Sequence, residues 1–200
     1  MRPRAFLYMP LLALILIAGI IGGSTLPFDN QAVAHAGLWR IGHPEPAGLL
    51  ILVTHLGGSF VLVPLALIVA GWLWLSGARR DALLLLATTM SGRAMVEFLK
   101  LLIDRPRPSL DPYPVYVSSQ SFPSGHAGNS MVTYLALALF ALPERWRPQG
   151  LAAALALALA IGTTRPVLGV HWPTDVIGGW AFGILWVLLW ASVSRRPESA

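Results

Sequence analysis

Long apolar runs, separated by short polar or proline-containing stretches, dominate this sequence. The pattern divides the chain into six apolar segments, which we expect to be helices: 5–23, 48–75, 82–102, 125–142, 150–163 and 174–193. A helix needs about 20 apolar residues to cross the roughly 30 Å hydrocarbon core of a bilayer. Most of the segments approach or exceed that length, and the fifth can extend past Thr163. The sequence therefore predicts an all-α, polytopic bundle of six transmembrane helices with short loops.

The composition agrees with a membrane protein. Of the 200 residues, 56% are hydrophobic and 12% are charged, whereas a soluble domain carries about 25% charged residues. Six spans leave no room for a separate soluble domain, so we expect residues 1–200 to form a single integral membrane domain. Cysteine is absent, which excludes disulfides and thiolate metal ligands.

Arginines at the ends of the apolar segments predict the orientation of the chain. With six spans, four arginine pairs fall on one side of the membrane: Arg2 and Arg4, Arg79 and Arg80, Arg145 and Arg147, and Arg195 and Arg196. Basic residues flank spans mainly on the cytoplasmic side, so we expect that side and both termini to be cytoplasmic. The net charge is +5, but the chain contains no basic run, and we expect no nucleic-acid partner.

The first segment has a second interpretation, as a signal peptide that is cleaved. Small residues in "AVAHAG" resemble a cleavage site, but they lie well past the end of the segment. The apolar core is also longer than the usual 7–15 residues. We therefore favour a retained helix.

Some basic residues fall on the opposite, outer side of the predicted bundle, against the charge bias used to predict this orientation. Lys100 closes the third segment, and Arg105 and Arg107 follow in "KLLIDRPRP", where prolines disfavour a helix. Arg93, Glu97 and Lys100 share one helical face, at positions i, i+4 and i+7. One interpretation of that face is an internal ion pair between Arg93 and Glu97, with Lys100 reaching outward; for Arg93 and Glu97 alone we favour it over a catalytic role.

A second group of polar residues lies in "SFPSGHAGNS", at the start of the fourth segment. Pro123 suits the first turn of a helix, and Ser124 is a natural capping residue. Gly125 leaves the backbone open to close approach, and free N–H groups at a helix start can bind an anion. His126 projects from the first turn, although a capped helix with an incidental histidine remains an alternative.

A third group lies in "TTRPVLGVHWPTD", between the fifth and sixth segments. His171 and Asp175 are four residues apart, a spacing that lets two side chains meet on one helical turn. The carboxylate can then bind one ring nitrogen and leave the other with a free lone pair. Arg165 ends the fifth segment. An ordinary ion pair at a helix start is the alternative.

All three groups emerge on the outer side of the predicted bundle. Their two histidines and one aspartate do not have the spacing of a common metal motif, so we expect no metal and no cofactor. Cations around a histidine nucleophile instead suggest a phosphate ligand.

These residues resemble the three-part signature of the type-2 phosphatidic acid phosphatase family, whose fold core is shared with vanadate-dependent haloperoxidases. Lys100, Arg107 and Pro108 match its first part, and Pro123 to His126 match its second part without change. Arg165, His171 and Asp175 match its third part, with Thr164 where the family usually has Ser. The match covers residues 100–175, and six spans also suit the family.

The resemblance implies a metal-independent mechanism and a role for each matched residue. His171 would attack phosphorus and form a phosphohistidine, with Asp175 as its orienting carboxylate. His126 would protonate the leaving oxygen and later activate water. The phosphate-binding residues would be Lys100, Arg107, Ser124, Gly125 and Arg165. Arg105 falls outside the spacing of the signature, so we expect it to be a bystander.

The expected function is that of a lipid phosphatase in the bacterial inner membrane, with its active site on the outer, periplasmic face. Phosphatidate, phosphatidylglycerophosphate and undecaprenyl diphosphate are the substrate classes that the resemblance suggests, and the sequence does not choose among them. Transfer of the phosphoryl group to another alcohol is an open alternative. A transporter is a further alternative, but the deep polar candidates are few: His55, Arg93 and Glu97. The oligomeric state cannot be read from the sequence.

Overall fold

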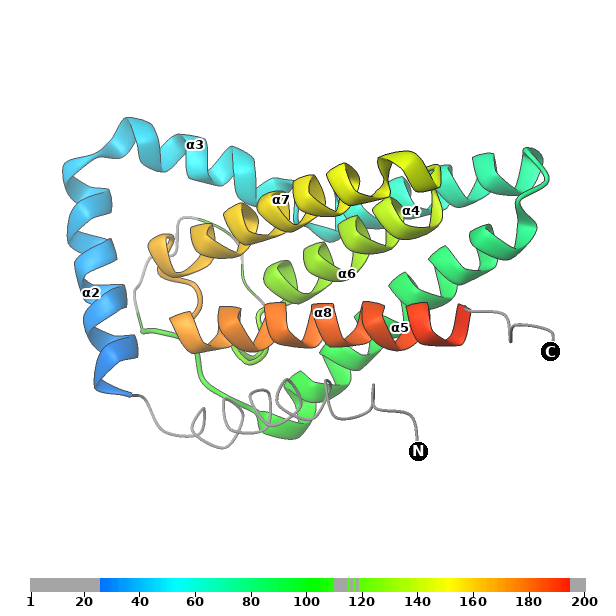
Figure 1. The fold of residues 1–200 in the computed structure, drawn as a ribbon. Helices are drawn as coiled ribbons and strands as arrows, with labels where there is room; N and C mark the ends of the chain where they lie inside the picture. Colours follow the sequence, from blue (N-terminus) through cyan, green and yellow to red (C-terminus); the bar gives the residue numbers. More distant parts are fainter. Residues whose placement is uncertain (1–25, 110–114, 116, 118, 195–200) are drawn as a thin grey trace.

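The chain folds into a bundle of helices (Figure 1). The computed structural model describes residues 26–109, 115, 117 and 119–194, and this part of the chain contains helices and loops but no strand. Its helices are α2 (Pro27–Gly42), α3 (Pro44–His55), α4 (Ser59–Leu75), α5 (Arg79–Ile103), α6 (Gly125–Phe140), the short 3₁₀ helix η1 (Glu144–Trp146), α7 (Arg147–Val167) and α8 (Pro173–Ser194). The all-α prediction is therefore confirmed for these residues.

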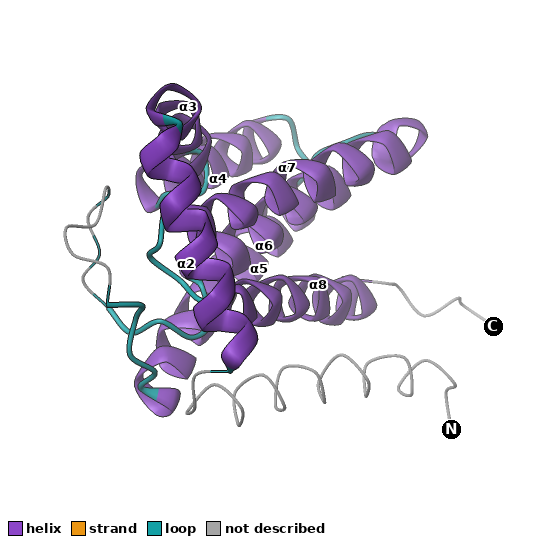
Figure 2. Cartoon of the chain, turned by 90° about the vertical axis from the view of Figure 1, so that its left-hand side faces the viewer, coloured by secondary structure: helices purple, strands orange, loops and turns teal. Residues whose placement is uncertain are grey.

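Helix α6 lies at the centre of the bundle, in contact with α4, α5, α7 and α8. Most of its residues are buried, and Figure 2 shows it between α7 and α8 when the bundle is viewed from one end. Small residues allow this close packing. A Cβ atom added to Gly179 of α8 would lie 2.8 Å from the Ser124 carbonyl oxygen, and one added to Gly183 would lie 2.6 Å from the Met131 Cβ atom.

Four helical stretches are long and apolar enough to cross a membrane: Gly48–Leu75, Arg79–Ile103, Glu144–Val167 and Pro173–Ser194. Large apolar side chains on their outer faces are exposed, including Phe60 at 98%, Ile68 at 69% and Leu101 at 72%. Such a surface suits contact with lipid. The chain is therefore an integral membrane protein. Helix α6 spans 16 residues, and the predicted segment 5–23 lies outside the described residues.

The stretch that we expected to connect the first two spans, 24–47, is largely helical in the structure. It forms α2 and the start of α3, and α2 runs across one end of the bundle rather than along it (Figures 1 and 2). Pro27 begins α2 and Pro44 begins α3, which suits proline because the first helical position needs no N–H donor.

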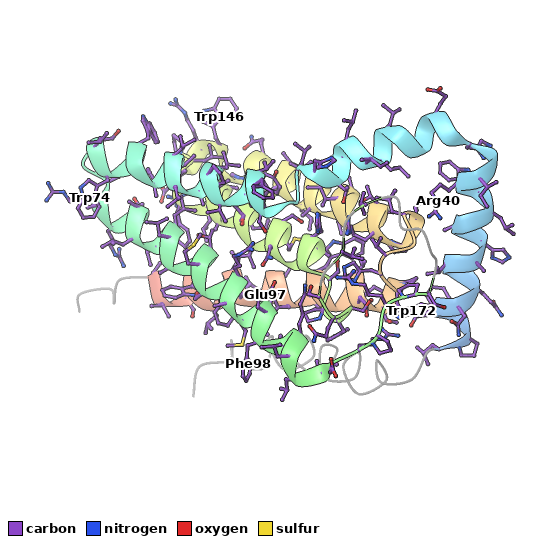
Figure 3. The ribbon with its side chains drawn as sticks, turned by 180° about the vertical axis from the view of Figure 1, so that it is seen from behind. Arg40, Trp74, Glu97, Phe98, Trp146 and Trp172 are labelled. Atoms are coloured by element: carbon purple, nitrogen blue, oxygen red, sulfur yellow. The ribbon has the colours of Figure 1, made fainter. Side chains whose placement is uncertain are left out.

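The two ends of the bundle carry different residues. Figure 3 shows Trp74 and Trp146 toward one end, and Trp172 and Arg40 toward the other. The turns that join α4 to α5 and α6 to α7 lie at the first end, whereas α2 and the α7–α8 turn lie at the second (Figure 1). The three polar groups of the signature also meet near the second end.

Candidate active site

The three signature segments, far apart in the sequence, surround one pocket of about 530 Å³. Helices α3, α4, α5, α6 and α7 and the loops before α6 and α8 contribute to its wall. Six of the eight expected site residues line it: Lys100, Arg107, Gly125, His126, Arg165 and His171. The other two, Ser124 and Asp175, are fully buried next to this group. The structure thus brings the expected residues together.

Asp175 holds the ring of His171 from one side. Its Oδ2 atom lies 3.4 Å from Nδ1 of His171 and accepts a hydrogen bond of 2.8 Å from the backbone N–H of Trp172. The hydroxyl of Ser121 donates to the same oxygen and lies 3.3 Å from Nδ1. The i, i+4 spacing therefore produces the expected pair, and Ser121 is an additional partner that the motif spacing did not reveal.

The other ring nitrogen of His171 faces the cations of the pocket. Nε2 lies 3.1 Å from Nη1 of Arg107, and a guanidinium can only donate, so Nε2 must accept with its lone pair. The ring proton is then on Nδ1, toward Asp175. Burial lowers the pKa of His171 well below 6.5, and the positive charges of Arg107, Arg165 and Lys100 lower it further. His171 therefore presents a neutral nucleophilic nitrogen at neutral pH.

Backbone carbonyl groups hold Arg107 in place. Its Nε donates to the carbonyl of Ser119 at 2.6 Å, Nη1 to that of Val170 at 2.6 Å, and Nη2 to that of Gln120 at 3.3 Å. These bonds join the proline-rich loop to the turn before α8. The guanidinium is thus fixed beside His171.

Lys100 points into the pocket instead of reaching outward. It is 5% exposed, its Nζ donates to the hydroxyl of Ser119 at 2.8 Å, and it lies 3.7 Å from the carboxylate of Glu97. The alternative in which Lys100 reaches outward was therefore wrong. The described ion pair of Glu97 is with Lys100, and Arg93, Glu97 and His55 all line the same pocket.

Arg165 is buried and tied to the second span. Its Nη1 donates to the hydroxyl of Thr54 in α3 at 2.8 Å. Its Nε, like the hydroxyl oxygen of Ser124, is buried without a hydrogen-bond partner among the described residues. Buried donors are normally paired, so these two suit an anion that would occupy the site.

Ser124 precedes α6 in an extended conformation, but its side chain makes no capping hydrogen bond. The expectation that it caps the helix was wrong, and its hydroxyl oxygen is buried without a hydrogen-bond partner among the described residues. Gly125 approaches the cations closely, because a Cβ atom there would lie 3.4 Å from Nζ of Lys100. The helix start and Lys100 thus face the same small volume.

His126 lies against a break in the second predicted span. Helix α3 ends at His55 and α4 begins at Ser59. In this break, a Cβ atom on Gly57 would lie 3.3 Å from Cδ2 of His126. The two glycines, Gly57 and Gly58, therefore make room for the imidazole of α6.

Arg105 is not a bystander. It is 2% exposed, and it donates from Nη1 to Oδ1 of Asp175 at 2.6 Å and from Nη2 to Oδ2 of Asp29 at 2.9 Å. Its position at the outer end of a span, against the usual charge bias, was the sequence signal for such a role. Asp29 gave no comparable signal.

No group of three or more His, Asp or Glu side chains that could hold a metal ion occurs in the described part of the chain.

The chain resembles several known phosphatases along most of its length. It is 32% identical to "Phosphatidylglycerophosphatase B" of Bacillus subtilis (strain 168), over 86% of each chain. It is 32% identical to "Lipid A 1-phosphatase" of Rhizobium johnstonii, over 98% of this chain and 82% of that protein. It is 26% identical to "Undecaprenyl-diphosphatase" of Sulfolobus acidocaldarius, over 90% of this chain and 87% of that protein.

Solved structures give the same result for the fold. The crystal structure of a transmembrane PAP2-type phosphatidylglycerolphosphate phosphatase from Bacillus subtilis matches with a TM-score of 0.84 at 32% identity, covering 93% of this chain and 94% of that one. The structure of Aquifex aeolicus LpxE matches with a TM-score of 0.65 at 22% identity, covering 84% of this chain and 96% of that one. The latter similarity concerns the fold alone. The family model of the PAP2 superfamily matches residues 81–198, and with this match and the relatives above, the chain belongs to the PAP2 superfamily.

Proposed function

We propose that this protein removes phosphate from a lipid phosphate or diphosphate through a phosphohistidine intermediate on His171. The chain is a membrane phosphatase, and hence a hydrolase, of the PAP2 class. The observation that carries the mechanism is the environment of His171. Its Nε2 lies 3.1 Å from Arg107 in a pocket lined by four cationic side chains, those of Arg93, Lys100, Arg107 and Arg165, while Asp175 faces its Nδ1.

In the first step, Nε2 of His171 attacks phosphorus. The Nε2–P bond forms as the bond between phosphorus and the leaving oxygen breaks. His126, on the same pocket wall, gives its proton to the leaving oxygen. The Nδ1–H group of His171 stays directed at Asp175, which stabilises the positive charge that develops on the ring.

In the second step, His126 accepts a proton from a water molecule. The water oxygen attacks phosphorus, the Nε2–P bond breaks, and inorganic phosphate leaves with His171 restored. Because His126 gained a proton in this step, it is ready for the next substrate.

The phosphoryl oxygens would be held by Lys100, Arg107 and Arg165, together with Ser124 and the backbone at Gly125. The unpartnered hydroxyl of Ser124 and Nε of Arg165 support this assignment. A preorganised donor that binds developing negative charge typically contributes about 3–4 kcal/mol to the barrier, or about 10²–10³ in rate. Loss of any one cation should therefore reduce kcat strongly.

The substrate class follows from the pocket and the relatives. The relatives act on phosphatidylglycerophosphate, on the 1-phosphate of lipid A and on undecaprenyl diphosphate, according to their names. We propose a lipid monophosphate or isoprenoid diphosphate as the substrate. We also propose six spans, with both termini cytoplasmic and the pocket facing the periplasm across a bacterial inner membrane.

The test is phosphate release from a panel of purified lipid mono- and diphosphates by the full chain, with a chelator present. We expect release from at least one lipid and none with His171→Ala. Trapping a labelled phosphoenzyme in His171→Ala would exclude this residue as the nucleophile. Adding an alcohol and analysing the products separates hydrolysis from phosphoryl transfer, because transfer would yield a new phosphate ester.

A further inference from the structure

A buried chain of ion pairs links α2 to the carboxylate behind His171. Arg105 lies between Asp175 and Asp29, with N–O distances of 2.6 and 2.9 Å. The side chain of Arg105 is 1% exposed, and both carboxylates are fully buried. Thr174 completes the cluster, since its backbone N–H and its hydroxyl donate to Asp29 at 3.1 and 2.7 Å.

We propose that Asp29 and Arg105 are positioning residues for the reaction. In this proposal Arg105 fixes the plane of the Asp175 carboxylate, and Asp29 neutralises Arg105 so that Asp175 keeps its negative charge for His171. The inference rests on the proposed function, in which His171 is the nucleophile.

The two oxygens of Asp175 have different partners. Oδ1 accepts a hydrogen bond from the guanidinium of Arg105. Oδ2 accepts hydrogen bonds from the hydroxyl of Ser121 and the backbone N–H of Trp172, and it faces His171. Contacts on both oxygens prevent the carboxylate from rotating about its Cβ–Cγ bond. The oxygen that faces the imidazole therefore stays in place through both steps.

The charges of the cluster explain why Asp29 is needed. Phosphorylation of Nε2 makes the ring of His171 positive, and a nearby carboxylate stabilises that charge. A guanidinium 2.6 Å from Asp175 would oppose this effect if it were alone, because buried charges interact strongly. Asp29 supplies the compensating charge, so the three groups together keep one net negative charge beside the ring.

Asp29 also lies outside the region that defines the family match, which begins at residue 81. Helix α2 runs across the end of the bundle (Figure 1); its Asp29 reaches the cluster behind His171, and its Arg40 donates to the carbonyl of Val167 at 2.9 Å. Arg40 thus ties α2 to α7 without contacting Asp175, and it offers a matched control.

The test compares Asp29→Asn, Arg105→Met, the double variant and Arg40→Met with the wild-type full chain. Mutating the outer-shell partners of metal ligands typically changes activity about 10–100-fold, and we use the same scale for partners of the carboxylate that orients His171. We expect kcat to fall about tenfold in Asp29→Asn and about 100-fold in Arg105→Met. KM and the inhibition constant of inorganic phosphate should stay within about twofold, because the phosphate-binding cations are untouched.

The double variant gives the sharpest readout. Arg105→Met leaves two buried carboxylates without their shared cation, whereas the double variant removes one of those charges as well. We therefore expect the double variant to recover at least about fivefold in kcat over Arg105→Met, a non-additivity typical of groups in one network. Multiplicative losses would overturn the proposal, as would a wild-type kcat in Asp29→Asn.

Arg40→Met tests whether activity depends on the charge of Asp29 or only on the attachment of α2 to the bundle. Equal losses in Arg40→Met and Asp29→Asn would show that α2 attachment alone matters, which would also overturn the proposal. If Arg105→Met does not fold, the comparison of Arg40→Met with Asp29→Asn tests the proposal without it. If wild-type protein releases no phosphate, the proposed function fails; if it does and Asp29→Asn is equally active, only this inference fails.

Discussion

Individual side chains in the pocket differ in the chemistry that their surroundings allow. His171 is buried with its Nε2 toward Arg107 and its Nδ1 toward Asp175, so it suits attack on phosphorus. His126 has a different setting, against the glycine break between α3 and α4. Its place in the lining of the same pocket suits proton transfer to and from an oxygen. In the proposed mechanism, the two histidines therefore have separable roles.

The role of His126 can be tested with two leaving groups. An alkoxide leaves poorly without a proton, whereas a phosphate leaves more readily, so His126→Ala should damage monophosphate cleavage more than diphosphate cleavage. General acid–base groups contribute about 10²–10⁴-fold, and we expect the monophosphate loss to fall in this range. Steady-state release of phosphate from both lipids measures it.

His55 lines the same pocket and serves as the control for that experiment. We expect His55→Ala to affect both substrates to the same extent, since the proposed mechanism gives His55 no part in protonating the leaving oxygen. Equal losses in His126→Ala on the two substrates would remove His126 from the general-acid role.

The protonation state of His171 gives a second prediction. Burial and the neighbouring cations hold its pKa well below 6.5. The ring should therefore remain neutral as the pH falls from about 7.5 to about 5.5, where an ordinary histidine becomes charged. NMR of histidine-labelled protein, assigned by comparison with His171→Gln, measures this. A His171 signal that titrates with a midpoint near 6.5 would contradict the prediction.

Some residue roles could be read from the sequence and others could not. The spacing of His171 and Asp175 was sufficient to predict their contact, because side chains four residues apart meet on one helical turn. Arg105 and Asp29 are 76 residues apart, and no local pattern links such a pair. Ser124 was misjudged because a hydroxyl before a helix usually caps it, whereas here its side chain makes no such bond.

At the scale of elements, the contact between α6 and α8 positions the signature segments. Gly179 lies against the first turn of α6, and a Cβ atom there would be 2.8 Å from the carbonyl oxygen of Ser124 and 3.0 Å from the backbone nitrogen of Gly128. Helix α8 carries Asp175, and the backbone N–H of Ser124 donates to the Asp175 carbonyl at 3.0 Å. The two helix starts are therefore locked to each other.

Substitution of Gly179 should disturb both stability and chemistry. Overpacking of this kind typically costs about 1–3 kcal/mol, and a displacement of about 1 Å in an active site can lower the rate about 10²-fold. We expect Gly179→Ala to lower both the thermal midpoint in detergent and kcat. Gly71→Ala is the matched control, because a Cβ atom at Gly71 of α4 has open space around it. Equal behaviour of the two variants would contradict this account of the contact.

The helices of the core were predictable, but α2 was not. Long apolar segments define α4, α5, α7 and α8, and the "PSGH" stretch correctly predicted a helix start at Gly125. Residues 27–42 mix apolar and polar side chains between prolines, a pattern that reads as a connection. Their helix is held by distant contacts such as that of Arg40 with Val167, which local sequence does not encode.

At the scale of the whole molecule, we expect the two ends of the bundle to be exposed on opposite sides of the membrane. Gln31 of α2 lies at the end with the pocket, and Gln149 of α7 lies at the other end; both are exposed. The natural chain has no cysteine, so a single cysteine can be introduced at either position without further change.

We expect a membrane-impermeant maleimide to label Gln31→Cys in spheroplasts of a bacterial expression host, whereas Gln149→Cys should react only after the membrane is permeabilised. This result would agree with the positive-inside rule, because Arg145 and Arg147 lie near Gln149. The reverse pattern would place the pocket on the cytoplasmic side. Activity of both variants, measured in parallel, shows that they are folded.

The anchoring of Arg107 by main-chain oxygens has a consequence for variation among related proteins. The carbonyl groups at positions 119, 120 and 170 are present whatever side chains those positions carry. Side chains at these positions can therefore be exchanged while the guanidinium beside His171 stays where it is. In the proposed mechanism, a guanidinium anchored in this way can bind the phosphate of lipids that have different head groups.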